Sequence, residues 1–233
     1  MKEIEYSQRG IVKLIGESAS EFPMWSITKY LDDICNHYNK ILQIVRTCIY
    51  LQNGDDSDLW VAKKSVSLFP DKSFEECFTF NEENYVKLAI KAGDPEQFWH
   101  IVTKYVRPVV FVKKYDNFIP LVDLINDDAI KIRSLSYNSP PLFDIEGVLG
   151  TLIELAYAGK KDAREEEEHI ARQLGQSADN YRRIAHASQI INDERTPEGV
   201  KVYANKALSE IIAKQEVLNR RLNIRVANID RKV

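Results

Sequence analysis

Residues 130–159 read IKIRSLSYNSPPLFDIEGVLGTLIELAYAG, and this stretch decides the fold class of the chain. Two strand-like runs flank a turn-rich segment that ends in Pro140-Pro141, and this pattern predicts a β-hairpin. A proline pair suits a turn or an edge strand and would interrupt a central strand ladder. From Val148 onward apolar residues recur at helical spacing, so a helix is predicted to cover the apolar face of the hairpin.

The hexapeptide Leu135-Ser136-Tyr137-Asn138-Ser139-Pro140 lies at the turn of this predicted hairpin. It resembles a segment of uncharacterised bacterial proteins in which a strand, a Ser-Tyr-Asn-Ser-Pro turn, a second strand and a helix follow one another. The resemblance covers residues 130–159 of a chain of 233 residues. It implies the same order of elements here, and it implies no activity.

The residues that precede this hairpin predict further strands and helices. Residues 4–15 mix β-branched and polar side chains and predict a first strand with a bend at Arg9-Gly10. A long helix is predicted to open at Ser20 and to stop at Asn53, because apolar residues recur at steps of three and four. The apolar face of that helix comprises Ile27, Leu31, Ile34, Tyr38, Ile41, Leu42, Val45 and Ile49.

Four shorter elements are predicted between the long helix and the hairpin. Strands are expected within residues 59–68 and 86–90, the second from its alternation of apolar and polar residues. A helix is expected to begin at Pro95 and to end before Pro108, and another to span residues 117–126. The predicted fold class is therefore α+β, with a mostly antiparallel sheet and several helices in residues 1–159.

Residues 160–233 are predicted to form a helical hairpin or a three-helix arm, called here the C-terminal arm. They contain no Trp, Phe or Cys and carry a net charge of +3, against −6 for residues 1–159. This change of composition places a domain boundary near Gly159. Thr196 is a predicted N-cap, with Pro197 at the first helical position.

Two apolar series in the C-terminal arm step by four and three residues, which is typical of a helical seam. The first contributes Ile170, Leu174, Tyr181, Ile184 and Ile191, and the second Ala204, Leu208, Ile211, Leu218 and Leu222. These seam residues are expected to pack either on the chain's own α/β domain or on another chain. Polar residues such as Gln215 occupy some positions of the two series. We favour the second alternative, a non-enzymatic scaffold or adaptor that forms a homo-oligomer or docks a protein partner.

The sequence contains no phosphate-binding, zinc-protease, serine-hydrolase or kinase motif. Glu166 and His169 have the spacing of a helical metal pair, but no second copy exists, so an acidic solvated face is the simpler interpretation. We therefore predict no metal and no cofactor. The alternative is an enzyme or nucleic-acid-processing factor whose site is assembled from scattered residues, for example around His100 or Cys77.

A second alternative is nucleic-acid binding by residues 220–233, which carry a net charge of +4. Basic side chains neutralise phosphates, but no aromatic residue interleaves here to stack a base. An ordinary solvated surface is the preferred interpretation of this tail. Its basic residues are Arg220, Arg221, Arg225, Arg231 and Lys232.

The cysteines and the apolar segments predict a cytoplasmic protein without a membrane span. Cys35, Cys48 and Cys77 form no C-x-x-C pair, which favours a reducing compartment. The most apolar segment, residues 147–159, is too short to cross a bilayer. The tryptophans are expected to pack in the core, and a binding groove lined by Trp25 and Trp60 is the functional alternative.

Overall fold

The computed structural model describes residues 6, 8–16, 23–53, 58–63, 85–88, 95–115, 117–124, 127–136, 140–159 and 186–231. The chain adopts an α+β fold with two antiparallel four-stranded sheets and, within these residues, five helices. Contacts divide the chain into two compact units. Unit 1 comprises Met1–Tyr38, Ala129–Gln189 and Glu210–Val233, and unit 2 comprises Asn39–Asp128 and Ile190–Ser209. Gly159, the predicted boundary, lies inside a segment of unit 1.

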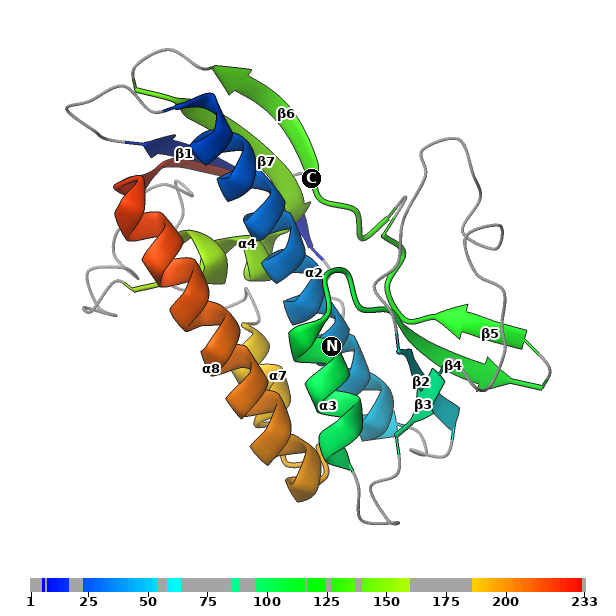
Figure 1. Cartoon of the computed structure of the whole chain (residues 1–233). Coiled ribbons are helices and arrows are strands. Elements are labelled where there is room, and N and C mark those ends of the chain that lie inside the picture. Colours follow the sequence, from blue (N-terminus) through cyan, green and yellow to red (C-terminus); the bar gives the residue numbers. More distant parts are fainter. Residues whose placement is uncertain are drawn as a thin grey trace. The chain divides into compact units, whose positions relative to one another are not determined.

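Unit 1 contains a sheet with the strand order β6-β7-β1-β8 (Figure 1). The predicted hairpin is confirmed, because β6 (Lys131–Ser136) pairs antiparallel with β7 (Leu142–Val148). Helix α4 (Leu149–Ala156) follows β7 directly, as predicted, and contacts β1 and β7. The first strand, β1 (Arg9–Gly16), pairs with β7, and its irregularity lies opposite β8 rather than at the predicted bend.

The long helix predicted from the apolar pattern is α2 (Met24–Asn53), and all eight residues of its predicted face are buried. The other long helix is α8 (Glu198–Arg221). In unit 1 the first half of α2 lies beside the second half of α8, and the two helices run in opposite directions (Figure 1). Buried hydrogen bonds join them, so the start of α2 and the end of α8 form one helical layer.

The predicted C-terminal arm is wrong in its last part, because the chain ends in a strand. Asn223 has a φ of +46°, a left-handed conformation that commonly ends a helix, and its N–H donates to the carbonyl of Arg220 at 3.1 Å. The chain then enters β8 (Ile224–Arg231), which pairs antiparallel with β1. Arg225 and Ile229 continue the steps of three and four residues beyond Leu222, but they lie in this strand and not in the helix. Besides α8, the described part of the arm contains the short helix α7 (Ala187–Ile191).

Unit 2 contains the second sheet, with the strand order β3-β2-β4-β5. Its elements are β2 (Leu59–Ala62), β3 (Tyr85–Lys87), α3 (Pro95–Lys104), β4 (Val110–Lys114) and β5 (Asn117–Pro120). The strands predicted within residues 59–68 and 86–90 correspond to β2 and β3, and the helix predicted from Pro95 corresponds to α3. The helix predicted over residues 117–126 is wrong, because β4 and β5 form a hairpin. Pro120 would remove a hydrogen bond inside a helix, whereas an edge strand such as β5 tolerates it.

The two faces of this second sheet differ. Leu59, Val61 and Val110 lie on one face and are completely buried. Trp60 lies directly opposite Lys87 on β3 and opposite Phe111 on β4, so these three side chains share the other face. That second face therefore combines an apolar cluster with cationic side chains. No described helix of either unit is long and apolar enough to cross a bilayer.

Candidate functional site

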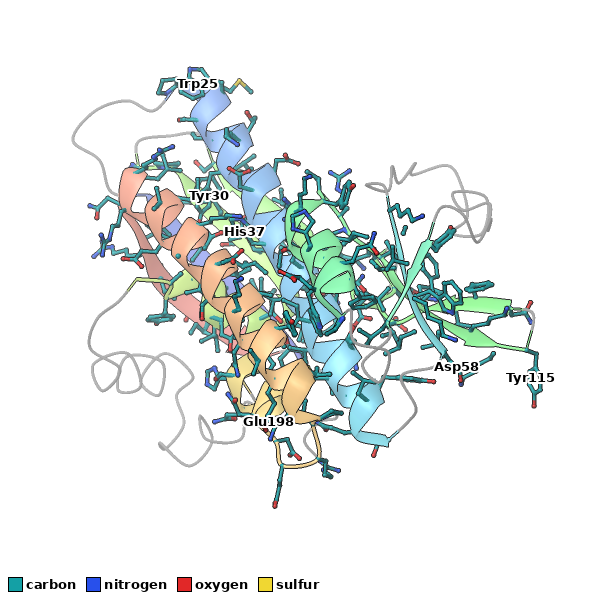
Figure 2. The ribbon with its side chains drawn as sticks, turned by 60° about the horizontal axis from the view of Figure 1, so that its bottom comes forward. Trp25, Tyr30, His37, Asp58, Tyr115 and Glu198 are labelled. Atoms are coloured by element: carbon teal, nitrogen blue, oxygen red, sulfur yellow. The ribbon has the colours of Figure 1, made fainter. Side chains whose placement is uncertain are left out.

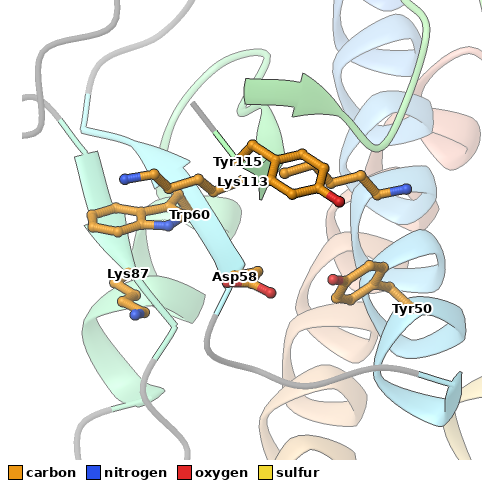
Figure 3. Close-up of a pocket in the computed structure, with 7 residues that line it drawn as sticks. Tyr50, Asp58, Trp60, Lys87, Lys113 and Tyr115 are labelled. Atoms are coloured by element: carbon orange, nitrogen blue, oxygen red, sulfur yellow. The ribbon is translucent and has the colours of Figure 1, made fainter. Parts of the chain in front are cut away.

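A pocket of about 600 Å³ lies at one end of the sheet of unit 2 (Figure 3). Strand β2 begins there and strands β3 and β4 end there, because β2 runs antiparallel to both neighbours. Residues from three strands, a hairpin turn and the last turns of α2 thus converge. The lining side chains are three lysines, three aromatic residues and one aspartate: Lys87, Lys113, Lys114, Tyr50, Trp60, Tyr115 and Asp58.

The two lysines of β4 reach the pocket from opposite faces of the sheet. Lys113 lies opposite Phe118 of β5, and Lys114 lies opposite Asn117. Successive side chains of a strand point to opposite faces, so Lys113 shares a face with Trp60 and Lys114 does not. The end of the sheet is therefore basic on both of its faces.

Aromatic rings hold two of the ammonium groups in place. The Nζ atom of Lys87 lies 5.5 Å from the ring centroid of Trp60, and Nζ of Lys113 lies 5.5 Å from that of Phe118. Trp60 and Phe118 contact each other edge to face at 6.2 Å. Figure 3 shows Trp60 between Lys113 and Lys87. Cation–π attraction at these distances restrains the ammonium groups without neutralising their charge.

The pocket keeps an excess of positive charge. Lys87 and Lys114 are exposed and form no ion pair within the described part of the chain. Among the described residues that line the pocket, Asp58 is the single carboxylate, and it makes no ion pair with the three lysines. In the described lining, three ammonium groups thus face one carboxylate, an arrangement that attracts an anion.

Tyr115 occupies an unusual backbone conformation at the rim of the pocket. Its φ is +56°, in the left-handed region that a residue with a side chain seldom adopts, and the residue is 95% exposed. Figure 2 shows Tyr115 at the tip of the β4–β5 hairpin, where it points into solvent. The ring therefore contributes no core packing and is available to a ligand.

The residues predicted to form a docking interface are largely buried within the chain itself. Ile191, Ala204, Leu208, Ile211 and Leu222 are at most 8% exposed, and Leu218 is half-buried. Ile170, Leu174, Tyr181 and Ile184 lie outside the described residues. On α8 the exposed apolar side chains are instead Val202 and Val217, at 61% and 49%. The second seam therefore forms part of the chain's own core.

The basic residues proposed to contact nucleic acid lie where α8 gives way to β8. Arg220 and Arg221 are exposed in the last turn of the helix, and Arg220 forms an ion pair with Glu216. Arg225 is exposed on the edge strand β8. This segment is thus part of a folded sheet. The side chain of Arg231 and the whole of Lys232 lie outside the described residues.

Of the other candidate residues that the structure describes, Trp60 alone lines this pocket. His100 is exposed on α3 and does not line it, and Cys77 lies outside the described residues together with the pair Glu166 and His169. Trp60 lines the pocket of unit 2, whereas Trp25 belongs to unit 1 and is 70% exposed. In the part of the chain that is described, no three His, Cys, Asp or Glu side chains are placed to hold a metal ion.

Lys113, Lys114 and Tyr115 were not predicted as site residues from the sequence. A signal was present, because Val109-Val110-Phe111-Val112 is a run of β-branched and aromatic residues that favours a strand. Lys113 and Lys114 end this strand, β4, and Tyr115 follows in the turn that leads to β5. No spacing in the sequence connects this turn with Asp58 or Lys87, which only the sheet brings near.

Comparison with known proteins supplies neither a family nor an activity for this chain. No protein-family model, curated protein or solved structure matches it. The functional argument therefore depends on the chemistry of the pocket.

Proposed function

We propose that the chain is a non-enzymatic binding protein that holds an anionic, phosphate-bearing ligand in the pocket of unit 2. The observation that carries this proposal is the gathering of Lys87, Lys113 and Lys114 around a pocket whose described lining has one carboxylate, Asp58. Lysine ammonium groups are compact point charges with three hydrogen-bond donors each, and they bind phosphate oxygens from many directions.

The remaining lining residues suit this role. The hydroxyl groups of Tyr50 and Tyr115 add donors for phosphate oxygens. The volume of about 600 Å³ falls in the range of small-ligand pockets. The described lining side chains include no serine, cysteine or histidine, so the usual pairing of a nucleophile with a histidine base is missing from the described part of the pocket. The pocket supplies charge and hydrogen bonds, which favours binding over catalysis.

Docking of a partner through the C-terminal helices has less support than the pocket. Such docking needs the seam residues, but Ile211 and Leu222, for example, are buried. A partner could reach them only if α8 moved from its place. Exposed apolar side chains on α8 are isolated, and isolated apolar residues are ordinary on protein surfaces. Formation of a homo-oligomer stays a prediction, and the mass of the protein in solution, measured by light scattering, tests it.

The proposed function is tested with tripolyphosphate as the probe, by isothermal titration calorimetry of the full chain. The double variant Lys87→Gln/Lys114→Gln removes two exposed charges, so we expect the fold to persist and the affinity to fall at least about tenfold. The matched control is Lys206→Gln/Lys214→Gln, which removes two exposed lysines of α8.

The control variant is expected to bind tripolyphosphate as the unmodified chain does. Raising the salt concentration from about 50 mM to about 200 mM should weaken binding to the unmodified chain, because the attraction is electrostatic. An equal loss of affinity in both double variants would show that overall charge, and not this pocket, attracts the anion.

A further inference from the structure

The aromatic residues of the pocket differ in what surrounds them. The Nζ atom of Lys87 lies over the Trp60 ring at 5.5 Å, and Phe118 contacts this ring edge to face, so Trp60 is already engaged by its neighbours (Figure 3). Tyr115 is 95% exposed and projects from the hairpin tip. Tyr115 is therefore the ring against which a planar group of a ligand can stack.

The lysines are distributed in a way that suits an extended anion. Lys87 and Lys113 lie on one face of the sheet, and Lys114 lies on the other. A compact anion would meet only part of this set. A chain with a negative charge on every repeating unit can pass around the end of the sheet and meet all three ammonium groups.

We propose that the ligand is a single-stranded nucleic acid, with phosphates on these lysines and one base stacked on Tyr115; this inference rests on the anion-binding function proposed above. Single-stranded nucleic acids are bound by grooves that combine basic side chains with stacking aromatic rings. A single strand exposes its bases, whereas a duplex keeps them stacked inside and away from Tyr115. Asp58 then provides an acceptor for a base amino group or a sugar hydroxyl.

The test measures fluorescence anisotropy of labelled oligo(dT) and oligo(U) of about twelve nucleotides, bound to the full chain. Tyr115→Ala should lower the affinity for both oligonucleotides about tenfold, because one stacked base is lost. Tyr115→Phe keeps the ring and loses only the hydroxyl donor, so it should lower the affinity much less than Tyr115→Ala does. Because Tyr115 is almost fully exposed, thermal unfolding of both variants should match that of the unmodified chain.

Tripolyphosphate separates the two proposals. It has no base, so Tyr115→Ala should bind it with at most a small loss from the missing hydroxyl, as should Tyr115→Phe. If tripolyphosphate binds but Tyr115→Ala leaves oligonucleotide affinity unchanged, stacking on Tyr115 is overturned and the anion-binding function stands. If neither tripolyphosphate nor oligonucleotide binds, both proposals fail. A polyglutamate peptide or a duplex that binds more tightly than the single strands would also overturn the inference.

Discussion

The Nδ1 atom of His37 lies 2.8 Å from Oε1 of Gln215, and both side chains are buried in unit 1. Nε2 of Gln215 donates to Oδ1 of Asn219 at 2.8 Å, and the hydroxyl of Tyr30 donates to the same oxygen at 3.1 Å. Nδ2 of Asn219 donates to the carbonyl of Leu155 at 2.8 Å. Since Gln215 donates through Nε2, its Oε1 is an acceptor and His37 carries a proton on Nδ1. Figure 2 shows Tyr30 and His37 on the side of α2 that faces α8.

Removal of the central amide of this network should destabilise the protein. In Gln215→Leu, the Nδ1–H of His37 loses its acceptor inside a buried layer, and we expect the free energy of unfolding to fall by about 2–3 kcal/mol. Urea denaturation measures the change. Lys214→Leu, at the exposed neighbouring position, is the control and should stay within about 0.5 kcal/mol of the unmodified chain. A Gln215→Leu variant as stable as this control would show that the network contributes little.

A methyl group at Gly147 should also destabilise unit 1. A Cβ atom there would lie 2.8 Å from the hydroxyl oxygen of Tyr38, which accepts a hydrogen bond from the N–H of Val148 at 2.7 Å. Gly147→Ala therefore displaces the Tyr38 ring and breaks this bond, at a cost of about 2–4 kcal/mol. Thermal unfolding provides the measurement. Tyr38→Phe, which removes the hydroxyl alone, should cost less than Gly147→Ala, and the reverse order would contradict the steric argument.

Stability should decline at alkaline pH because of Cys48. Burial raises the pKa of the Cys48 thiol from 9.0 to about 12. Above pH 9.0 the unfolded chain releases this proton and the folded chain keeps it. The contribution of the Cys48 thiol to stability is therefore fully present below pH 9.0 and is lost as the pH rises to about 12. The expected loss is at most about 1.4 kcal/mol per pH unit in this window.

Urea denaturation of the unmodified chain and of Cys48→Ala, at several pH values in this window, isolates the contribution of the thiol. Burial also raises the pKa of the Tyr30 phenol, and this lowers the free energy of unfolding of both proteins equally at alkaline pH. The free energy of unfolding of Cys48→Ala should fall less steeply with pH than that of the unmodified chain. Equal slopes would show that Cys48 is ionised in the folded state or protected in the unfolded one.

Replacing one carboxylate oxygen of Asp128 with an amide nitrogen should destabilise the protein. Its Oδ1 accepts from Nη2 of Arg46 at 3.0 Å, and its Oδ2 accepts from the N–H of Asp123 at 3.0 Å. In Asp128→Asn one of these donors faces an NH₂ group, so we expect a loss of about 2 kcal/mol in unfolding free energy. An exposed carboxylate of α8 provides the control, Glu210→Gln, which should change little. A matching loss in both variants would point to overall charge instead of these two bonds.

Elements with a strong local pattern were predictable from the sequence. Helix α2 buries all eight residues of its predicted face, because its apolar period and its required packing agree. The β6–β7 hairpin was equally clear, since a proline-rich turn separates two strand-like runs. In both cases the information lies in neighbouring residues.

Elements that depend on distant residues were not predictable. The seam of steps of four and three continues through Leu222, Arg225 and Ile229, yet Asn223 ends the helix and β8 pairs with β1 instead. The spacing of the apolar residues contains no signal that the helix ends and the chain turns at Asn223. The pocket was missed for the same reason, because its residues come from separate elements that share no sequence spacing.

The pairing of β1 with β8 has a consequence for synthesis of the protein. The paired residues are between 208 and 221 positions apart in the sequence, from Gly16 with Ile224 to Gly10 with Arg231. On the ribosome, β1 leaves the exit tunnel long before β8 has been translated, so one of its backbone edges waits for its partner. An exposed strand edge invites pairing with other chains. Until β8 emerges, the nascent polypeptide is therefore open to aggregation through this edge of β1.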